Sequence, residues 1–410
     1  MSKSAAKWEI VEGNLTTPQG FRVAAVAAGI KKKRDALDLA LIISDSQSTT
    51  AAGVFTTNRV AAAPVLLSRK HLAEGRGRCR AIVVNAGNAN ACTGRTGMQT
   101  AEETARVAGD LLGIEAAQVL VASTGVIGIA LDPDLILRQL PILKQKLSRE
   151  NAGKVAEAIM TTDTFPKTCV VRSEARGKVV HIAGVAKGSG MIHPQMATML
   201  SFITTDASVG ERMLQNLLAG AVKESFNRIT VDGDTSTNDT AVALASGLSE
   251  TAVIPGNDSR AWFSDGLTLL CQSLARMIAR DGEGASKLIT VEVVGARTAL
   301  DADRVARAIA NSPLVKTAVA GSDPNWGRII CAAGYSGAKF DPNKIDISVN
   351  NMPLCRKGID AGFDEAAAHR ELDHKEILLH VDLHAGRATA RIWTCDFTHA
   401  YIDINSSYRS

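Results

Sequence analysis

Short apolar runs and longer stretches with helically spaced apolar residues succeed one another along this chain. Leu39–Ser44 and Arg80–Asn85 are apolar and bounded by polar residues, which is typical of buried strands. Further runs of this kind are Val119–Ser123, Cys169–Arg172, Val179–Val185, Thr198–Thr205, Leu288–Val294, Ile345–Val349, Ile377–Leu383 and Ala388–Trp393. The polar turn Glu174–Lys178 predicts a hairpin between two of them.

Helical spacing is clearest in Arg212–Asn227, where Leu214, Leu217 and Leu218 begin one apolar stripe. The other predicted helices are Gln99–Leu112, Leu135–Leu147, Lys154–Met160 and Ala261–Arg280. Because strands and helices are mixed throughout, the pattern predicts a layered α/β architecture. No fixed-period repeat, low-complexity linker or shift in composition marks a domain boundary.

The composition is that of an ordinary globular protein. Of the 410 residues, 46% are hydrophobic and 21% are charged, which permits a large core and excludes wholesale disorder. At ~150 residues per domain, this length suggests two or three domain-sized units. A net charge of +4 without strong clustering, and only 4% aromatic residues, argue against nucleic acid as the main partner.

The cysteines and the apolar runs indicate the cellular compartment in which the protein is expected. The seven cysteines are scattered and form no CxxC pair, so buried reduced thiols are expected rather than a disulfide framework or a zinc site. No apolar run approaches the ~18–20 residues of a membrane span. The apolar stretch Val23–Ile30 precedes its basic cluster Lys31–Arg34, the reverse of a secretory signal, and the cluster is expected in a solvated turn between strands. We therefore expect a cytoplasmic protein.

The segment Lys187–Leu200 holds the most informative chemistry. A Gly-rich loop containing Pro194 leads to a hydroxyl residue, Thr198, at the head of a predicted strand. The Thr198 hydroxyl can attack the Ala197 carbonyl, and hydrolysis of the resulting ester would leave Thr198 as a new N-terminus. Its free α-amine, with a reference pKa of ~7.7–8.0, can then act as the base for its own hydroxyl. On local sequence alone, an ordinary loop is the alternative, and a phosphate cradle is disfavoured because the GxxxxGK[ST] spacing is lacking.

Ordered motifs along nearly the whole chain resemble one family. They are Gly20–Ile30, Thr57–Val60, Asn85–Asn90, Ser123–Gly128, Thr161–Thr164, Lys187–Leu200, Asp232–Asp239, Ala279–Gly284, Gly321–Arg328 and Asn405–Tyr408. Together they resemble the ornithine acetyltransferase family, also called arginine biosynthesis bifunctional proteins or glutamate N-acetyltransferases. One departure is Gln195, where Asn is common, and it bears on the rate of cleavage rather than on its chemistry.

The resemblance implies a layered, self-cleaving fold of the N-terminal-nucleophile type. Cleavage between Ala197 and Thr198 would give an alpha chain, 1–197, and a beta chain, 198–410, which stay together as a heterotetramer of two alpha and two beta chains. Thr198 would take an acetyl group from N-acetylornithine and pass it to glutamate. The sequence leaves open whether the protein also uses acetyl-CoA, as some members do, and the bifunctional alternative is favoured. No cofactor and no metal are implied.

The resemblance also assigns site residues. Thr124 and Gly125 match the family's oxyanion hole, in which each preorganised donor contributes about 2.7–4 kcal/mol. The residues that match substrate contacts are Thr164, Lys187, Thr198, Glu283, Asn405 and Ser410. Lys187 can hold an α-carboxylate as a point charge, and Glu283 can bind the ammonium of ornithine.

Other polar residues leave alternatives open. Asp232, Asp234 and Asp239 suggest either a metal site or a hydrogen-bonded loop, and the loop is favoured because no His cluster accompanies them. His193 is expected to pack in its loop rather than to assist cleavage. Two rival functions remain: an amidase or aminopeptidase in which water is the acceptor, and a binding protein without catalysis.

Overall fold

The computed structural model describes residues 7–175, 177–193, 199–254, 256 and 258–406. The described residues form two compact units. The first unit draws on residues 1–188, 195–227 and 235–275, and the second on residues 189–194, 228–234 and 276–410.

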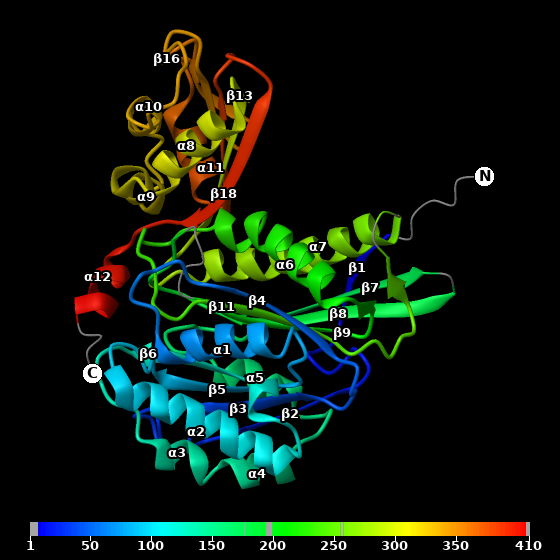
Figure 1. The fold of residues 1–410 in the computed structure, drawn as a ribbon. Helices are drawn as coiled ribbons and strands as arrows, with labels where there is room; N and C mark the ends of the chain where they lie inside the picture. Colours follow the sequence, from blue (N-terminus) through cyan, green and yellow to red (C-terminus); the bar gives the residue numbers. More distant parts are fainter. Residues whose placement is uncertain (1–6, 176, 194–198, 255, 257, 407–410) are drawn as a thin grey trace. The chain divides into compact units, whose positions relative to one another are not determined.

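A six-stranded sheet with strand order β1-β7-β8-β9-β11-β4 organises the first unit (Figure 1). Its strands are β1 (Glu9–Val11), β7 (Lys167–Ala175), β8 (Lys178–Lys187), β9 (Leu200–Thr205), β11 (Thr240–Ala245) and β4 (Thr50–Phe55). Neighbours are antiparallel except β9 and β11, which run parallel. Helices α6 (Glu211–Lys223) and α7 (Asp258–Arg280) cover one face; Leu270 and Leu274 of α7 face Gly184 of β8, where a Cβ would lie 3.0 Å from each leucine.

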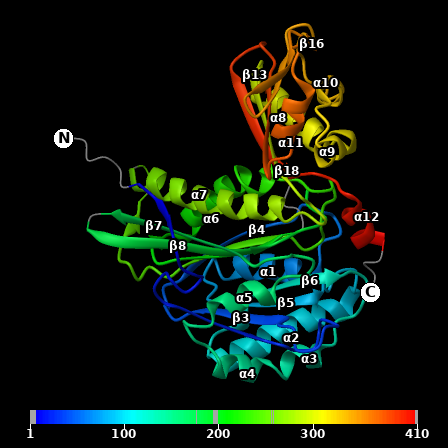
Figure 2. The ribbon, with the colours of Figure 1, turned by 180° about the vertical axis from the view of Figure 1, so that it is seen from behind.

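The other face of this sheet packs against a four-stranded sheet, as Figure 2 shows from behind. The second sheet has the order β2 (Phe21–Val26), β3 (Leu39–Ser44), β5 (Ala81–Asn88) and β6 (Val119–Val126). Ile42 and Ile82 from one sheet and Val185 and Phe202 from the other share one buried core, which α5 (Ala152–Ala158) joins. Helix α1 (Ala63–Glu74) contacts both β4 and β6. The predicted layered α/β architecture is therefore confirmed.

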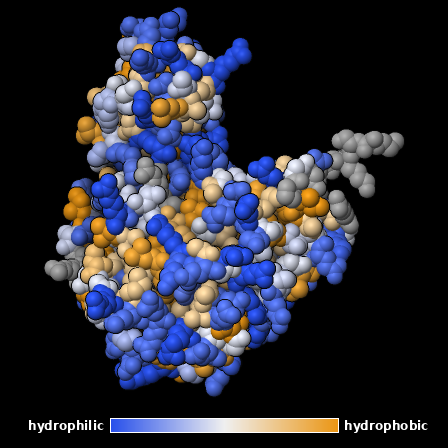
Figure 3. All heavy atoms as spheres, viewed as in Figure 1, coloured by the Kyte–Doolittle hydropathy of each residue, from blue (hydrophilic) through white to orange (hydrophobic). Residues whose placement is uncertain are grey.

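The outer face of the four-stranded sheet is covered by α2 (Gly94–Leu112), α3 (Pro133–Leu137) and α4 (Leu140–Gln145). The amphipathic helix α2 buries Ala101, Ala105 and Ala108, while Glu103 and Arg106 point to solvent. This division explains the largely hydrophilic surface over α2 in Figure 3. The small remaining elements of the first unit are η1 (Ala116–Gln118), β10 (Ser208–Val209) and β12 (Ala252–Val253).

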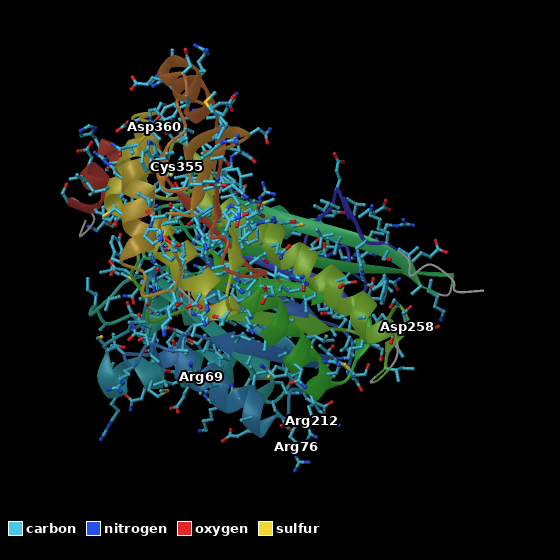
Figure 4. All side chains as sticks on the ribbon, turned by 90° about the horizontal axis from the view of Figure 1, so that it is seen from above. Arg69, Arg76, Arg212, Asp258, Cys355 and Asp360 are labelled. Atoms are coloured by element: carbon cyan, nitrogen blue, oxygen red, sulfur yellow. The ribbon has the colours of Figure 1, made fainter. Side chains whose placement is uncertain are left out.

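The second unit has its own six-stranded sheet, with the order β16-β15-β14-β17-β13-β18. The strands are β13 (Leu288–Ala296), β14 (Asp346–Val349), β15 (Met352–Arg356), β16 (Ile359–Asp360), β17 (Glu376–Asp382) and β18 (Ala388–Cys395). The helices are α8 (Ala299–Ala310), α9 (Pro313–Ala320), α10 (Trp326–Gly334), α11 (Glu365–Leu372) and α12 (His399–Ser406). The short η2 (Phe226–Arg228) begins in the first unit and ends in the second. Cys355 and Asp360, labelled in Figure 4, mark strands β15 and β16.

Several predictions of local structure need correction. The single helix expected over Leu135–Leu147 is wrong, because Pro141 lies in the first turn of a separate helix, α4. Cys92 and Cys331 are exposed, against the expectation of buried thiols, whereas the other five cysteines are buried and all seven are free. The basic cluster Lys31–Arg34 does lie between two strands, as predicted. Of the helices in the described part of the chain, none combines the length and apolar character that crossing a bilayer requires.

The two chains that cleavage would produce both contribute to the first unit. Strands β9 and β11 follow the predicted cut, and they lie between β8 and β4, which precede it. Register pairs such as Lys187↔Leu200 and Thr240↔Phe55 therefore join one predicted chain to the other. Because these pairs lie inside one sheet, neither chain contains the whole sheet on its own.

We therefore expect a cut after residue 197 to leave one particle. A denaturing gel should resolve fragments of 197 and 213 residues, while gel filtration in native buffer should elute both fragments together. Separation of the two fragments without denaturant would contradict the interleaved sheet.

Candidate active site

The end of β6 presents Thr124 and Gly125 in a tightly held backbone. Asn238 donates from Nδ2 to the carbonyl oxygens of Ser123, at 2.8 Å, and Ala89, at 2.6 Å. Gly125 has a φ of +133°, and a Cβ there would lie 2.3 Å from the carbonyl carbon of Gly87. Only glycine fits this approach of β5 and β6, so the peptide that carries the Gly125 N–H has a fixed place.

Lys187, the last residue of β8, reaches the hydroxyl of Thr124. Its Nζ donates to Thr124 Oγ1 over 3.4 Å, and both side chains are buried. Because the hydroxyl oxygen accepts from the ammonium, its own proton is available for another acceptor. A buried cation beside this hydroxyl also acts in a medium of low dielectric, where its field is strong.

The carboxylate of Asp163 holds the side chain of Lys187 in place. Its carboxylate accepts from Lys167 Nζ at 2.7 Å and from the Gly188 amide at 2.7 Å, and lies 3.9 Å from Lys187 Nζ. Burial by itself would raise the pKa of Asp163, but the charges of Lys187 and Lys167 and the Thr161 amide hold it at about 2. The carboxylate is therefore ionised at neutral pH and orients both lysines.

Glu283 and Asn405 come together in the second unit. Asn405 Nδ2 donates to Glu283 Oε2 at 2.9 Å, and the Glu283 amide donates to the Ser189 carbonyl at 3.0 Å. The carboxylate lies against Gly190, where a Cβ would be 2.3 Å from its oxygen. Only 7% of Glu283 is exposed, and Asn405 supplies its side chain with a hydrogen-bond donor.

Asp232 holds the Gly-rich loop of the second unit. Its carboxylate accepts from the backbone amides of Met191, Ile192 and Asp234, which is the hydrogen-bond network expected for this stretch. The described residues contain no group of three or more His, Cys, Asp or Glu side chains that could hold a metal. In the same loop, burial and Arg307 lower the pKa of His193, whose buried Nδ1 has no hydrogen-bond partner among the described residues.

The predicted site residues fall into three sets. The first unit contains Thr124, Gly125, Lys187 and the exposed Thr164, of which Thr124 and Lys187 are in contact. The second unit contains Glu283 and Asn405, which are also in contact. Gln195, Ala197, Thr198 and Ser410 lie outside the described residues, and so does the first part of the predicted strand Thr198–Thr205.

Sequence reasoning missed the residues that hold the site. Asp163 and Asn238 lie within motifs that carry the family resemblance, Thr161–Thr164 and Asp232–Asp239, but neither was assigned a role. Lys167 lies just outside the first motif, four residues from Asp163. An Asp–Lys pair at this spacing was the available signal.

Comparison with known proteins identifies the family. The ArgJ family model matches residues 22–410, and the chain belongs to the ArgJ family. It is 48% identical over 403 residues to the arginine biosynthesis bifunctional protein ArgJ of Symbiobacterium thermophilum, covering 98% of this chain and 100% of the relative. It is 47% identical over 407 residues to the protein of the same name from Caldanaerobacter subterraneus, again covering 98% and 100%.

A solved structure also resembles the chain. The crystal structure of arginine biosynthesis bifunctional protein argJ from Bacillus halodurans matches with a TM-score of 0.50 and 48% identity. The match covers 52% of this chain and 100% of that chain.

The charge of Asp163 leads to a prediction about stability in acid. Because its pKa is depressed from 3.8 to about 2, ionised Asp163 stabilises the fold above about pH 4, and this stabilisation is lost as the pH falls through about 2. A depression of this size corresponds to about 2 kcal/mol. The difference in unfolding free energy between wild type and Asp163→Asn should therefore shrink by about 2 kcal/mol between pH 5 and pH 2, measured by denaturant titration.

The control is Asp134→Asn, which breaks an exposed pair with Arg138. Its difference from wild type should stay within about 0.5 kcal/mol across this range. A constant difference for Asp163→Asn would show that folding does not lower the pKa of Asp163.

Proposed function

We propose that this protein is a self-cleaving acetyltransferase of arginine biosynthesis, which moves the acetyl group of N-acetylornithine to glutamate. The observation that carries the proposal is the Thr124 hydroxyl, which accepts from buried Lys187 beside the fixed Gly125 peptide, in a chain of the ArgJ family. Two donors held in this way suit an acyl-transfer intermediate that develops a negative oxygen.

In the proposed cycle, Thr198 is the nucleophile. Its hydroxyl attacks the acetyl carbonyl of N-acetylornithine, and its α-amine takes the hydroxyl proton. The Thr124 hydroxyl and the Gly125 N–H stabilise the oxyanion, and collapse of the intermediate releases ornithine and leaves acetyl-Thr198. Glutamate then attacks this ester through its amine, giving N-acetylglutamate and free Thr198.

Lys187 has a part in this cycle that its contacts support. By donating to Thr124 Oγ1, it leaves the hydroxyl proton of Thr124 available to the oxyanion. Asp163 contacts Lys187 and acts on Thr124 only through it, so Asp163 is a positioning residue. In this role Lys187 acts through Thr124, whereas the family resemblance assigns it a contact with the substrate carboxylate.

Cleavage between Ala197 and Thr198 has support from a relative's chain length. Residues 198–410 make up 52% of this chain, which equals the share covered by the complete Bacillus halodurans chain. Such a half-length chain is what self-cleavage would produce.

The remaining predicted contacts are suited to amino-acid substrates. Glu283, supported by Asn405, offers a negative charge for the ammonium of ornithine. Thr164, Thr198 and Ser410 complete the proposed set of contacts. We further propose that acetyl-CoA also serves as a donor, as expected of a bifunctional protein, that no cofactor is needed, and that the enzyme is a cytoplasmic heterotetramer of two alpha and two beta chains.

The reaction can be tested with each donor and acceptor separately. With N-acetylornithine and glutamate, we expect N-acetylglutamate and ornithine in equal amounts, and with acetyl-CoA and glutamate we expect N-acetylglutamate and free CoA. Thr198→Ala should give an uncut chain without either activity, because it removes the nucleophile. Free acetate, formed at the same rate with and without glutamate, would instead indicate a hydrolase.

Ser201→Ala is the matched control for Thr198→Ala. Ser201 lies three residues further on, in β9, and its buried hydroxyl has no hydrogen-bond partner among the described residues. Removing it should leave both cleavage and transfer at wild-type rates. Transferase activity in uncut Thr198→Ala protein would refute the proposed function.

Thr124 can be tested by a change that keeps its shape. Thr124→Val should lower kcat about 10²–10³-fold, because the oxyanion loses one donor. Rates are measured on the cleaved fraction of each preparation. Thr104→Val removes another buried hydroxyl, from α2, and should leave kcat within about twofold of wild type. A Thr124→Val enzyme with wild-type kcat would exclude this hydroxyl from the oxyanion hole.

A further inference from the structure

Two asparagine side chains hold Ser123, the residue before Thr124, at two different atoms. Asn85 Oδ1 accepts from the Ser123 hydroxyl at 2.6 Å, and Asn238 Nδ2 donates to the Ser123 carbonyl oxygen at 2.8 Å. All three side chains are buried. We call this arrangement the Ser123 clamp. Because Ser123 is held through both its side chain and its peptide group, it cannot shift or rotate without breaking one of these bonds.

Further hydrogen bonds fix the two amide groups of the Ser123 clamp. Asn85 Nδ2 donates to the Asn88 carbonyl at 2.9 Å. Asn238 Nδ2 also donates to the Ala89 carbonyl at 2.6 Å, and Asn238 Oδ1 accepts from the Thr237 hydroxyl at 2.5 Å. The nitrogen and the oxygen of both amides therefore have partners. A buried amide that is satisfied on both sides has one preferred orientation.

The pairing of β5 with β6 does not fix this part of the backbone on its own. The parallel register shifts at Asn88, which pairs with both Thr124 and Val126. An irregularity of this kind interrupts the regular ladder of hydrogen bonds and lets a strand bend. Asn85 bonds to the Asn88 carbonyl at the same place. Side chains therefore supply a constraint that the ladder lacks here.

The position of Ser123 determines where the proposed oxyanion donors lie. Thr124 follows it directly, and because threonine is β-branched, the direction of its hydroxyl follows the backbone. The Gly125 N–H belongs to the next peptide. Lys187 contacts the Thr124 hydroxyl over 3.4 Å, which is long for a hydrogen bond and constrains the hydroxyl weakly. Oxyanion donors are effective only when they are held in place before the reaction.

The Ser123 clamp draws on both fragments that the proposed cleavage would give. Asn85 and Ser123 precede the cut, whereas Asn238 follows it. The first fragment therefore carries the oxyanion donors, and the second fragment supplies part of what holds them.

We propose that Asn85 and Asn238 are positioning residues of the oxyanion hole. They fix the peptide group and the side chain of Ser123, and through Ser123 they place the Thr124 hydroxyl and the Gly125 N–H. Neither amide gains or loses a proton in this role. The proposal rests on the proposed transferase function and adds a requirement to it: the second fragment must be bound for the donors of the first fragment to be in place.

Each arm of the Ser123 clamp can be removed separately. Ser123→Ala removes the bond to Asn85, and Asn238→Leu removes the bond to the Ser123 carbonyl. Each change should lower kcat about 10-fold and leave KM within about twofold of wild type, because both oxyanion donors remain but are placed less precisely. Rates are measured with N-acetylornithine and glutamate on the cleaved fraction. A loss confined to KM would overturn the positioning role.

The two arms hold one residue, so their effects should not multiply. Combining Ser123→Ala with Asn238→Leu should lower kcat clearly less than the product of the single effects, which is about 100-fold. A loss equal to that product would show that the two amides do not act on one peptide. Asn238→Asp keeps the size of the side chain and removes both donors, so it replaces Asn238→Leu if the leucine variant does not fold.

Asn58→Leu is the matched control. Asn58 also joins the two fragments, because its Nδ2 donates to the Thr235 carbonyl at 3.1 Å, while its Oδ1 accepts from the Val60 amide at 2.9 Å. These bonds lie outside the Ser123 clamp, so kcat should stay within about twofold of wild type. An equal loss of kcat in Asn58→Leu would show that any loosened contact between the fragments slows the reaction, and would overturn the specific role of the clamp.

Hydrogen–deuterium exchange tests the Ser123 clamp without reference to the reaction. Peptides that cover residues 119–126 should exchange faster in Ser123→Ala and Asn238→Leu than in wild type, whether or not the chain is cut, and should be unchanged in Asn58→Leu. Wild-type kcat and wild-type exchange in both clamp variants of an active enzyme would overturn the positioning role alone. Wild-type protein without transferase activity would overturn the proposed function, and the role in catalysis with it.

Discussion

The pairing of β8 with β9 is the constraint on which the rest of the first unit depends. It joins Lys187, at the end of one strand, to Leu200, at the start of the next, across the loop that contains the proposed cut. Because β8 also pairs with β7, and β9 with β11, the two strands are held in the sheet from both sides. The sheet can therefore lose the covalent link after residue 197 and keep its architecture.

The pKa values of two buried carboxyl groups near this pairing are shifted in opposite directions. Asp163 is surrounded by Lys167, Lys187 and backbone amides, so its pKa falls and it serves as a fixed anion. Burial raises the pKa of Asp239 and outweighs the Met199 amide, a side-chain hydrogen bond with Thr56 and the charge of Lys187, which all lower it. Burial disfavours charge in both cases, and at Asp163 the charges of Lys187 and Lys167 outweigh it. A fixed anion suits positioning, and a carboxyl group with a raised pKa suits proton transfer.

The sequence predicted the elements with strong periodicity. Strand β3 and helix α2 follow from an uninterrupted apolar run and a regular apolar stripe, which local physics determines. The prediction of one helix over Leu135–Leu147 was wrong. The apolar spacing continues through Pro141, but proline has no backbone N–H and cannot continue a regular helix. The division into two units has no local signal, since both units draw on segments from distant parts of the chain.

Roles in the candidate site could be predicted only for residues that match functional positions of the family. The Thr124–Gly125 pair and Lys187 came from the family resemblance, and the structure brings Thr124 and Lys187 into contact. Asp163 and Asn238 act across long sequence separations, through contacts with Lys187 and with Ser123. Spacing along the chain does not encode such contacts, because sheet pairing between distant strands creates them.

Intact-mass spectrometry of purified protein after brief exposure to N-acetylornithine without glutamate tests the central claim most directly. The account predicts two fragments, with the larger one beginning at Thr198, heavier by one acetyl group, and returned to its original mass by glutamate. A single uncut chain that is competent in transfer, or an acetyl group located elsewhere than Thr198, would contradict it.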